Sequence, residues 1–169
     1  MTSFVEITKE RKMHSHLYEV NIGWNTGRKG VMCSPEISSH SSNPSCIEVA
    51  TPPQFPEGME GIWSPEHLFT ASVSSCLMTT FLAIAENSKL DFEDFQCKSF
   101  GKLEQVEGKF IMSEVILEPT VTIREPKDKE KALRVLDKSE RACLISSSIK
   151  SKVTMNPTIK VDQEAIVQA

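Results

Sequence analysis

The stretch that decides the fold is SPEHLFTASVSSCLMTTFLAIAENS, residues 64–88. Ser64 can cap a helix, Pro65 has no amide hydrogen to leave unpaired in the first turn, and Glu66 complements the helix dipole. The side chains that follow are apolar on most sides of a helix: Leu68, Phe69, Val73, Cys76, Leu77, Phe81, Leu82, Ile84 and Ala85. This pattern predicts a helix that runs to about Ser88 and is buried within the fold.

Beyond this helix the pattern changes to the alternation of β-strands. Segments 95–106 and 109–123 alternate apolar and polar residues, and Glu107-Gly108 between them suits a hairpin turn. Residues 128–142 return to helical spacing, with Asp128 and Glu130 in the first turn. We expect a short helix over 143–152 and a last strand over 158–161.

A second strand pattern precedes the long helix. Alternate positions from 16 to 24 are occupied by His16, Tyr18, Val20, Ile22 and Trp24, as in a half-buried strand. Residues 25–30 supply a turn and residues 31–33 a returning strand, which places Arg28 at the tip of a hairpin. The Ser-, Pro- and Gly-rich segment 34–61 predicts a long surface excursion, broken only by a short strand over 47–50.

Length and composition fit one globular domain. The chain has 169 residues and a mass of 18.9 kDa, with 39% hydrophobic and 25% charged residues. These values are typical of a single soluble domain, here spanning residues 1–169. Together with the element order they predict an α+β fold of mainly antiparallel strands around a long buried central helix.

Charge and segment composition narrow the partners and the compartment. The net charge of -4 and the pI near 5.6 remove the general attraction to nucleic acid or to an anionic membrane surface. No apolar run is expected to approach the ~18 residues of a membrane-spanning helix. Residues 9–12, KERK, interrupt the place where a signal peptide would carry its apolar stretch. We therefore expect a cytoplasmic protein with small-molecule or protein partners.

The five cysteines are the main candidates for chemistry. They contain no C-x-x-C pair, and the four histidines show no metal-ligand spacing, so neither a zinc site nor a secreted disulfide framework is predicted. Cys76 falls inside the long helix, where a cysteine is ordinarily a small hydrophobe. Cys143 falls at a break between two helical segments, where the amides of the next turn can stabilise a thiolate. Two such thiols would suit a peroxidatic and a resolving cysteine, although sequence spacing alone does not bring them together.

Two motifs carry a resemblance to a known family. Residues 50–55, ATPPQF, and residues 63–76, WSPEHLFTASVSSC, resemble the OsmC/Ohr family of osmotically inducible and organic hydroperoxide resistance proteins. The resemblance extends over about residues 18–161. Its most specific part is Ser-Pro-Glu-x-Leu-Phe, followed by small residues that end in Cys76, with Cys143 as the second cysteine. It implies an OsmC/Ohr-like fold in an intertwined homodimer whose two sites form where the subunits meet.

The resemblance also implies roles for four residues. Cys76 would attack the peroxide and Cys143 would resolve the sulfenic acid so formed. Arg28 matches the family's arginine in a Gly-Arg-x-Gly hairpin and would hold the Cys76 thiolate, while Glu66 would orient Arg28 through a bidentate pair. Taken without the family, Arg28 is an ordinary solvated turn residue and Glu66 a favourable charge in a first helical turn. Cys33, Cys46 and Cys97 match no family position and are interpreted as packing or surface thiols.

The implied activity is a thiol-dependent peroxidase of oxidative-stress defence. An organic hydroperoxide would be reduced to an alcohol, and the Cys76–Cys143 disulfide would then be reduced by an external dithiol such as a lipoyl group, with no metal, flavin or haem. One departure favours an alternative. Many relatives have a proline after the second cysteine, whereas this chain has Leu144, and the 34–61 segment is long. A non-catalytic redox-sensing or small-molecule-binding protein of the same fold is therefore the competing hypothesis.

Overall fold

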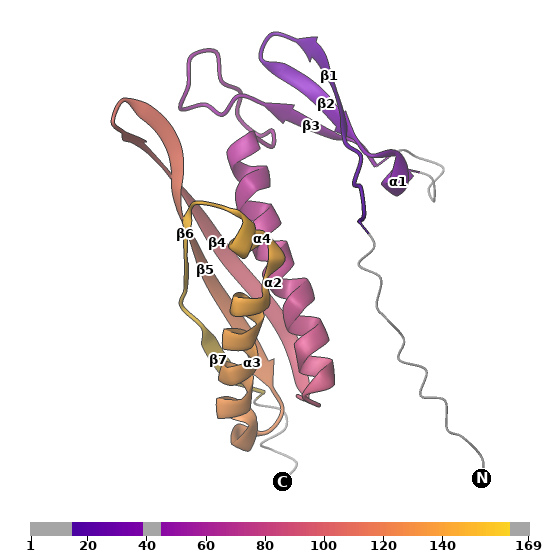
Figure 1. The fold of residues 1–169 in the computed structure, drawn as a ribbon, viewed down its shortest axis with the longest axis vertical. Coiled ribbons are helices and arrows are strands. Elements are labelled where there is room, and N and C mark those ends of the chain that lie inside the picture. Colours follow the sequence, from indigo (N-terminus) through magenta and orange to yellow (C-terminus); the bar gives the residue numbers. More distant parts are fainter. Residues whose placement is uncertain (1–14, 39–44, 163–169) are drawn as a thin grey trace, which may run out of the picture. The chain divides into compact units, whose positions relative to one another are not determined.

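The computed structural model describes residues 15–38 and 45–162 (Figure 1). Its internal contacts divide the chain into two compact units, Met1–Met59 and Glu60–Ala169. Each unit has its own sheet. The prediction of a single domain over 1–169 stays a prediction, and the two units are described separately.

The first unit contains a three-stranded antiparallel sheet in the order β1-β2-β3. Its elements are β1 (Asn21–Thr26), β2 (Lys29–Cys33), the short helix α1 (Pro35–Ser38) and β3 (Ile47–Ala50). The β1–β2 turn contains Gly27, whose φ of 53° lies in the left-handed region that glycine adopts without a Cβ clash. Arg28 follows in the same turn, which confirms the predicted hairpin. Strand β3 confirms the predicted strand over 47–50.

The prediction of a half-buried strand over 16–24 is wrong in two respects. Residues 15–20 are not in a strand, and every residue of β1 is exposed, including Trp24 at 80%. The alternating apolar side chains of β1 do lie on the same face of the strand. They stay exposed because, within the described part of this unit, no second layer of structure covers them.

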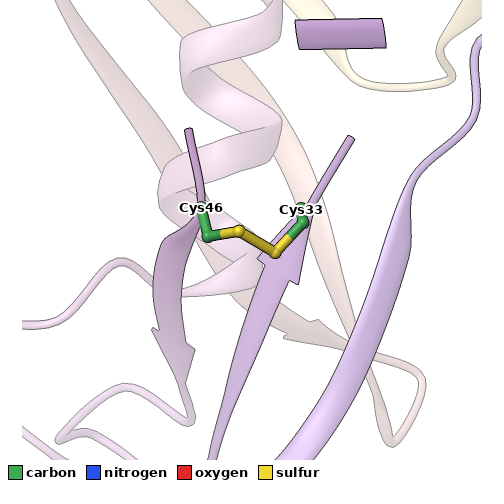
Figure 2. The surroundings of a disulfide bond; sticks show 2 residues. All are labelled: Cys33 and Cys46. Atoms are coloured by element: carbon green, nitrogen blue, oxygen red, sulfur yellow. A yellow bond between two sulfur atoms is a disulfide. The ribbon is translucent and has the colours of Figure 1, made fainter. Parts of the chain in front are cut away.

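The first unit also contains a disulfide bond between Cys33 and Cys46, with an S–S distance of 2.00 Å and a Cα–Cα distance of 4.4 Å. Figure 2 shows the sulfur bridge joining the end of β2 to the chain just before β3. The interpretation of these residues as thiols is therefore wrong. The reason is the strand register: Met32 pairs with Ile47, so Cys33 and Cys46 stand opposite each other one step further along the ladder.

The second unit begins with the long helix α2 (Pro65–Asn87). Ser64 is its N-cap and its side chain accepts a hydrogen bond from the His67 amide, as the sequence predicts. Burial is restricted to one stripe at four-residue spacing, Val73, Leu77, Phe81 and Ala85. The expectation of burial on most sides is therefore wrong, and Leu82 on another side is 44% exposed.

Helix α2 also corrects the expectation about apolar runs. By length and composition alone it could cross a membrane, a test that the core helix of a soluble protein passes equally well. The hydroxyl groups of α2 form hydrogen bonds within the helix: Thr70 donates to the Glu66 carbonyl and Ser72 to the Phe69 carbonyl. The buried stripe shows that one side of α2 belongs to a protein core.

That core lies against a mixed sheet. Strands β4 (Phe92–Val106) and β5 (Lys109–Ile123) form the predicted antiparallel hairpin, and β6 (Lys152–Met155) and β7 (Thr158–Val161) pair in parallel with successive parts of β5. Glu107 and Gly108 both have positive φ, as a tight two-residue hairpin turn requires. The sheet is thus less uniformly antiparallel than predicted, because β6 and β7 return to β5 through a helical crossover.

The crossover consists of the 3-10 turn Pro126–Asp128, α3 (Lys129–Ala142) and α4 (Leu144–Ser148). Figure 1 shows α2 and α3 running along the β4–β5 hairpin. The predicted helix over 143–152 is too long: Ile149 is already extended and β6 begins at Lys152. The early end has a packing reason, since Ile149 and Val153 both pack against the cluster of Val73, Leu77, Val115 and Leu117.

Candidate active site

The second unit brings the two predicted reactive cysteines together. Cys76 lies on α2 between the buried residues Val73 and Leu77, and Cys143 is the residue at which α3 ends and α4 begins. Ile145, which packs against Val73 and Leu77, holds α4 beside α2. As a result the two thiols lie close enough to shift each other's pKa, and the Ile145 amide donates a hydrogen bond to the Cys76 sulfur at 3.5 Å.

Cys76 is surrounded by hydrogen-bond donors. Its partial burial raises the pKa of the thiol, but the Cys143 thiol, the Ile145 amide, the Thr80 hydroxyl and the Leu144 amide all lower it, and the net pKa is below the ordinary cysteine value. Donors stabilise a thiolate more than a thiol because they interact with its full negative charge. Cys76 is therefore the member of the pair that loses its proton first.

Cys143 is displaced in the opposite direction. It is only 1% exposed, and this burial, with the hydrogen bond to Cys76 and the charge of that sulfur, raises its pKa above the ordinary value. The Ser146 amide donates to the Cys143 sulfur at 3.5 Å and opposes the rise. The two thiols thus differ in the direction of their pKa shifts, which favours the thiolate at Cys76 and the protonated thiol at Cys143.

Glu66 lies in the first turn of α2, on the same helix as Cys76. Its Oε2 atom is buried and has no hydrogen-bond partner among the described residues. Ten residues of helix separate Glu66 from Cys76, a rise of about 15 Å along the axis, so the carboxylate does not touch the sulfur directly. A buried carboxylate oxygen without a donor is costly and is suited to receive a cation or a donor from elsewhere.

Arg28 belongs to the other unit. In the turn between β1 and β2, its Nε atom pairs with Oε2 of Glu57 at 3.3 Å, and both side chains are largely exposed. The Arg28 carbonyl accepts a hydrogen bond from the Thr51 amide, which fixes the backbone of the turn. The pairing of Arg28 with Glu66 stays a prediction, as does the contact of Arg28 with Cys76.

Sequence analysis missed three contributors to the thiol pair. Thr80 follows Cys76 by one helical turn, a spacing that places side chains on the same face and could have been recognised. The amides of Leu144 and Ile145 reach Cys76 through the backbone, so no side-chain motif reveals them. The Ser146 amide is one of the next-turn amides expected at Cys143, but the expectation that they lower the pKa of Cys143 is wrong, because burial outweighs them and the pKa is raised.

Other groups in the described ranges do not extend this site. Cys97, on β4, interacts with the Ser99 hydroxyl at 3.4 Å, and its burial raises the pKa of its thiol. Within residues 15–38 and 45–162, no three His, Cys, Asp or Glu side chains are grouped so that they could hold a metal ion. The chemistry that the geometry offers is that of two neighbouring thiols, one acidic and one protonated.

Comparison with known proteins gives the family of the chain. The family model described as OsmC-like protein matches residues 58–158, more than half of the chain. A Bacillus subtilis protein named "Uncharacterized protein YmaD" is 23% identical over 146 residues, which cover 85% of this chain and 93% of that protein.

Solved structures share the fold. An OsmC-like protein of unknown function from Vibrio cholerae superposes with a TM-score of 0.73 at 20% identity, covering 85% of this chain and 99% of the other. The organic hydroperoxide resistance protein OhrB of Bacillus subtilis gives 0.61 at 19% identity, covering 86% and 98%. An organic hydroperoxide resistance protein from Elizabethkingia anophelis gives 0.67 at 18%, covering 89% and 100%. With an α+β fold, a long helix bearing Cys76 and a family match over most of the second unit, the chain belongs to the OsmC-like protein family.

Proposed function

We propose that this protein is a thiol-dependent peroxidase that reduces organic hydroperoxides to alcohols. The observation that carries the proposal is the pair of neighbouring thiols, Cys76 on α2 and Cys143 at the α3–α4 break, with the Ile145 amide 3.5 Å from the Cys76 sulfur; the lowered pKa of Cys76 supports it. A thiolate is the nucleophile in such chemistry, and a second thiol within reach protects the oxidised sulfur. Two relatives of the same fold are named organic hydroperoxide resistance proteins.

The reaction follows from this arrangement in three balanced steps. The Cys76 thiolate attacks the terminal oxygen of ROOH; the O–O bond breaks, Cys76 becomes a sulfenic acid, and RO⁻ takes a proton and leaves as ROH. The Cys143 sulfur then attacks the Cys76 sulfur, forming a disulfide and releasing water. An external dithiol, such as a lipoyl group, reduces the disulfide by thiol–disulfide exchange and leaves as its own disulfide. These steps use no metal, flavin or haem.

We place this reaction in the cytoplasm and in a homodimer, with the hydroperoxide and the dithiol as small-molecule partners and with neither nucleic acid nor membrane involved. The external dithiol would return Cys76 and Cys143 to thiols after each turnover. The Cys33–Cys46 disulfide is the one feature that counts against the cytoplasm, where structural disulfides are rare. The net charge of -4 is consistent with partners other than nucleic acid.

Replacing each cysteine in turn tests the function and the assignment of roles. With one equivalent of cumene hydroperoxide, Cys143→Ser should stop at a Cys76 sulfenic acid that dimedone traps, whereas Cys76→Ser should give no adduct, since an alcohol does not replace the thiolate. The unsubstituted chain should form an internal disulfide, and Cys97→Ser, the matched control, should behave identically. Intact-mass measurement distinguishes all four. An adduct on Cys143 in Cys76→Ser would reverse the roles, and no oxidation in any chain would leave the binding-protein alternative.

We further propose that Arg28 and Glu66 serve the same step, with Arg28 holding the thiolate and the developing alkoxide and Glu66 orienting Arg28. The buried, unpartnered Oε2 of Glu66 supports this role. Arg28→Met should slow peroxide consumption at neutral pH by about tenfold or more, because each unit of rise in the Cys76 pKa lowers the thiolate fraction tenfold. Arg28→Lys should recover only part of the rate, since the planar fork is lost. Arg134→Met, at an exposed arginine of α3, is the control, and equal rates in both Met variants would make Arg28 an ordinary turn residue.

A further inference from the structure

Ser146 is a half-buried polar residue next to the thiol pair that the reaction above does not use. Its Oγ atom is shielded from solvent and makes no fully formed hydrogen bond to any described residue. Its amide already donates to the Cys143 sulfur at 3.5 Å. The neighbouring hydroxyls are committed differently: Ser147 donates to the Cys143 carbonyl and Ser148 to the Leu144 carbonyl. Of these three serines, Ser146 alone has a hydroxyl hydrogen still available beside Cys143.

The surroundings of Cys143 show when that hydrogen would be needed. In the reduced protein the pKa shifts favour the protonated thiol at Cys143, which needs no further donor. Once Cys76 is a neutral sulfenic acid, its negative charge is gone and Cys143 must become the nucleophile. Charge then develops on the Cys143 sulfur, and donors placed beside it stabilise that charge.

The groups that face Cys143 come from α2, α3 and α4. From α2 the titratable group is Cys76 itself. From α3, the Glu140 carbonyl accepts a hydrogen bond from the Cys143 amide. From α4, the Ser146 amide donates to the Cys143 sulfur at 3.5 Å and lowers the pKa of this thiol, and the Oγ atom of the same residue is buried without a hydrogen-bond partner among the described residues.

We propose that Ser146 is a positioning residue for the resolving step, whose hydroxyl donates to the Cys143 sulfur as Cys143 attacks the Cys76 sulfenic acid. The inference rests on the proposed peroxidase function. In this step the Cys143 S–H bond breaks, the S–S bond forms, the S–O bond of the sulfenic acid breaks, and the oxygen leaves as water with the Cys143 proton. The oxidant is the hydroperoxide that formed the sulfenic acid. Ser146 supplies a donor and gives up no atom.

A single-turnover experiment on the full chain separates this step from the first one. After one equivalent of cumene hydroperoxide, samples are quenched with dimedone at intervals across a range of pH, and the trapped sulfenic acid is measured by intact mass. Ser146→Ala should lose its sulfenic acid about tenfold more slowly at neutral pH, with the pH midpoint shifted upward by about one unit. Its peroxide consumption should stay within about twofold of the unsubstituted rate, because the first step belongs to Cys76. Ser146→Thr, which keeps the hydroxyl, should restore the resolving rate.

Ser148→Ala is the matched control, since it removes a hydroxyl of the same helix that is committed to a backbone carbonyl. An unchanged resolving rate in Ser146→Ala, an equal slowing in Ser148→Ala, or an equal slowing of both steps in Ser146→Ala would each overturn the proposal, the last two by revealing mere damage to α4.

A second measurement tests the effect of Ser146 on Cys143 independently of the peroxidase function. In the Cys76→Ser background the negative charge beside Cys143 is absent, and the thiolate absorbance can be titrated with and without Ser146→Ala. Adding Ser146→Ala should raise the Cys143 pKa by about one unit, and an unchanged titration would overturn the proposal. If the unsubstituted chain consumes no peroxide, the peroxidase function and the resolving role both fail, while the titration still decides whether Ser146 acts on the Cys143 sulfur.

Discussion

Cys76 and Cys143 carry the same kind of side chain, but the pKa of Cys76 is lowered and the pKa of Cys143 is raised. Both are removed from water, which raises the pKa of each thiol. The pKa of Cys76 is lowered by Cys143 at the α3–α4 break, by the amides of Ile145 and Leu144 on α4 and by Thr80 on α2, whereas Cys76 raises the pKa of Cys143. The difference between the two pKa values therefore arises from the interaction of the two thiols with each other and from the positions of a few nearby donors. Within the described residues, no charged side chain other than the two cysteines themselves is among its causes.

Thr80 tests this description of Cys76. Thr80→Val removes one donor at nearly constant volume, so the lowered pKa of Cys76 should rise toward the ordinary value. Because the thiolate is the reactive form, alkylation by iodoacetamide should fall severalfold, about three- to tenfold, at pH values below that pKa and be unchanged well above it. Thr79→Val is the control, since its hydroxyl donates to the carbonyls of Ser75 and Cys76 and is exposed. Peptide mass mapping follows Cys76 alone, and equal effects in both variants would contradict the role of Thr80.

At the residue scale, sequence analysis proposed Cys76, Cys143 and Glu66 as site residues but could not supply their surroundings. Side-chain identity is local information, while the amide of Ile145 reaches Cys76 only because α4 packs beside α2. The same limit explains the error at Cys33 and Cys46. Their bond depends on a strand register formed across residues 34–45, and no local pattern of the sequence specifies that register.

Elements with strong local signals were the ones predicted with accurate ends. Helix α2 begins after a capping serine and a proline, and the β4–β5 hairpin turns at Glu107-Gly108. Strand β6 was missed, although the equally short β3 and β7 were predicted with their observed bounds, because the predicted helix over 143–152 extended to Lys152, the first residue of the strand; β6 is stabilised by parallel pairing with β5. The exposed β1 shows the converse, since alternation predicts which side chains share a face and leaves open what covers that face.

The disulfide gives the first unit a stabilising element that can be removed on its own. Replacing both Cys33 and Cys46 by Ser opens a loop of 13 residues and should cost about 3 kcal/mol in the opening of this sheet, or about two orders of magnitude in amide exchange. Hydrogen exchange should therefore accelerate in β2 and β3 and stay unchanged in β4 and β5. Cys97→Ser is the control and should alter neither sheet. Equal acceleration in both sheets would mean that the bond stabilises more than the first unit.

At the scale of the whole molecule, apolar side chains remain exposed in the second unit. On α2 they include Met78 and Leu82, and on the hairpin Phe100 and Ile111. Exposed apolar area of this kind is often covered by another subunit. We expect a homodimer, and sedimentation at low micromolar concentration should give about twice the chain mass of 18.9 kDa. Leu82→Lys should shift the equilibrium toward monomer, whereas Leu133→Lys, at a similarly exposed leucine of α3, should not; a folded monomer in the unsubstituted chain would contradict the dimer.

The Cys33–Cys46 bond also changes how this molecule's oxidation is to be counted. All five cysteines lie in the described ranges, and with one disulfide present the chain offers three free sulfhydryls, those of Cys76, Cys97 and Cys143. Closing the Cys76–Cys143 bond leaves a single one, on Cys97. An excess of reductant opens both disulfides, so a count of total sulfhydryl groups does not distinguish the structural Cys33–Cys46 bond from the reactive Cys76–Cys143 bond. The number of thiols oxidised per chain can therefore be interpreted only when peptide mass mapping assigns each loss of two hydrogens to one pair of cysteines.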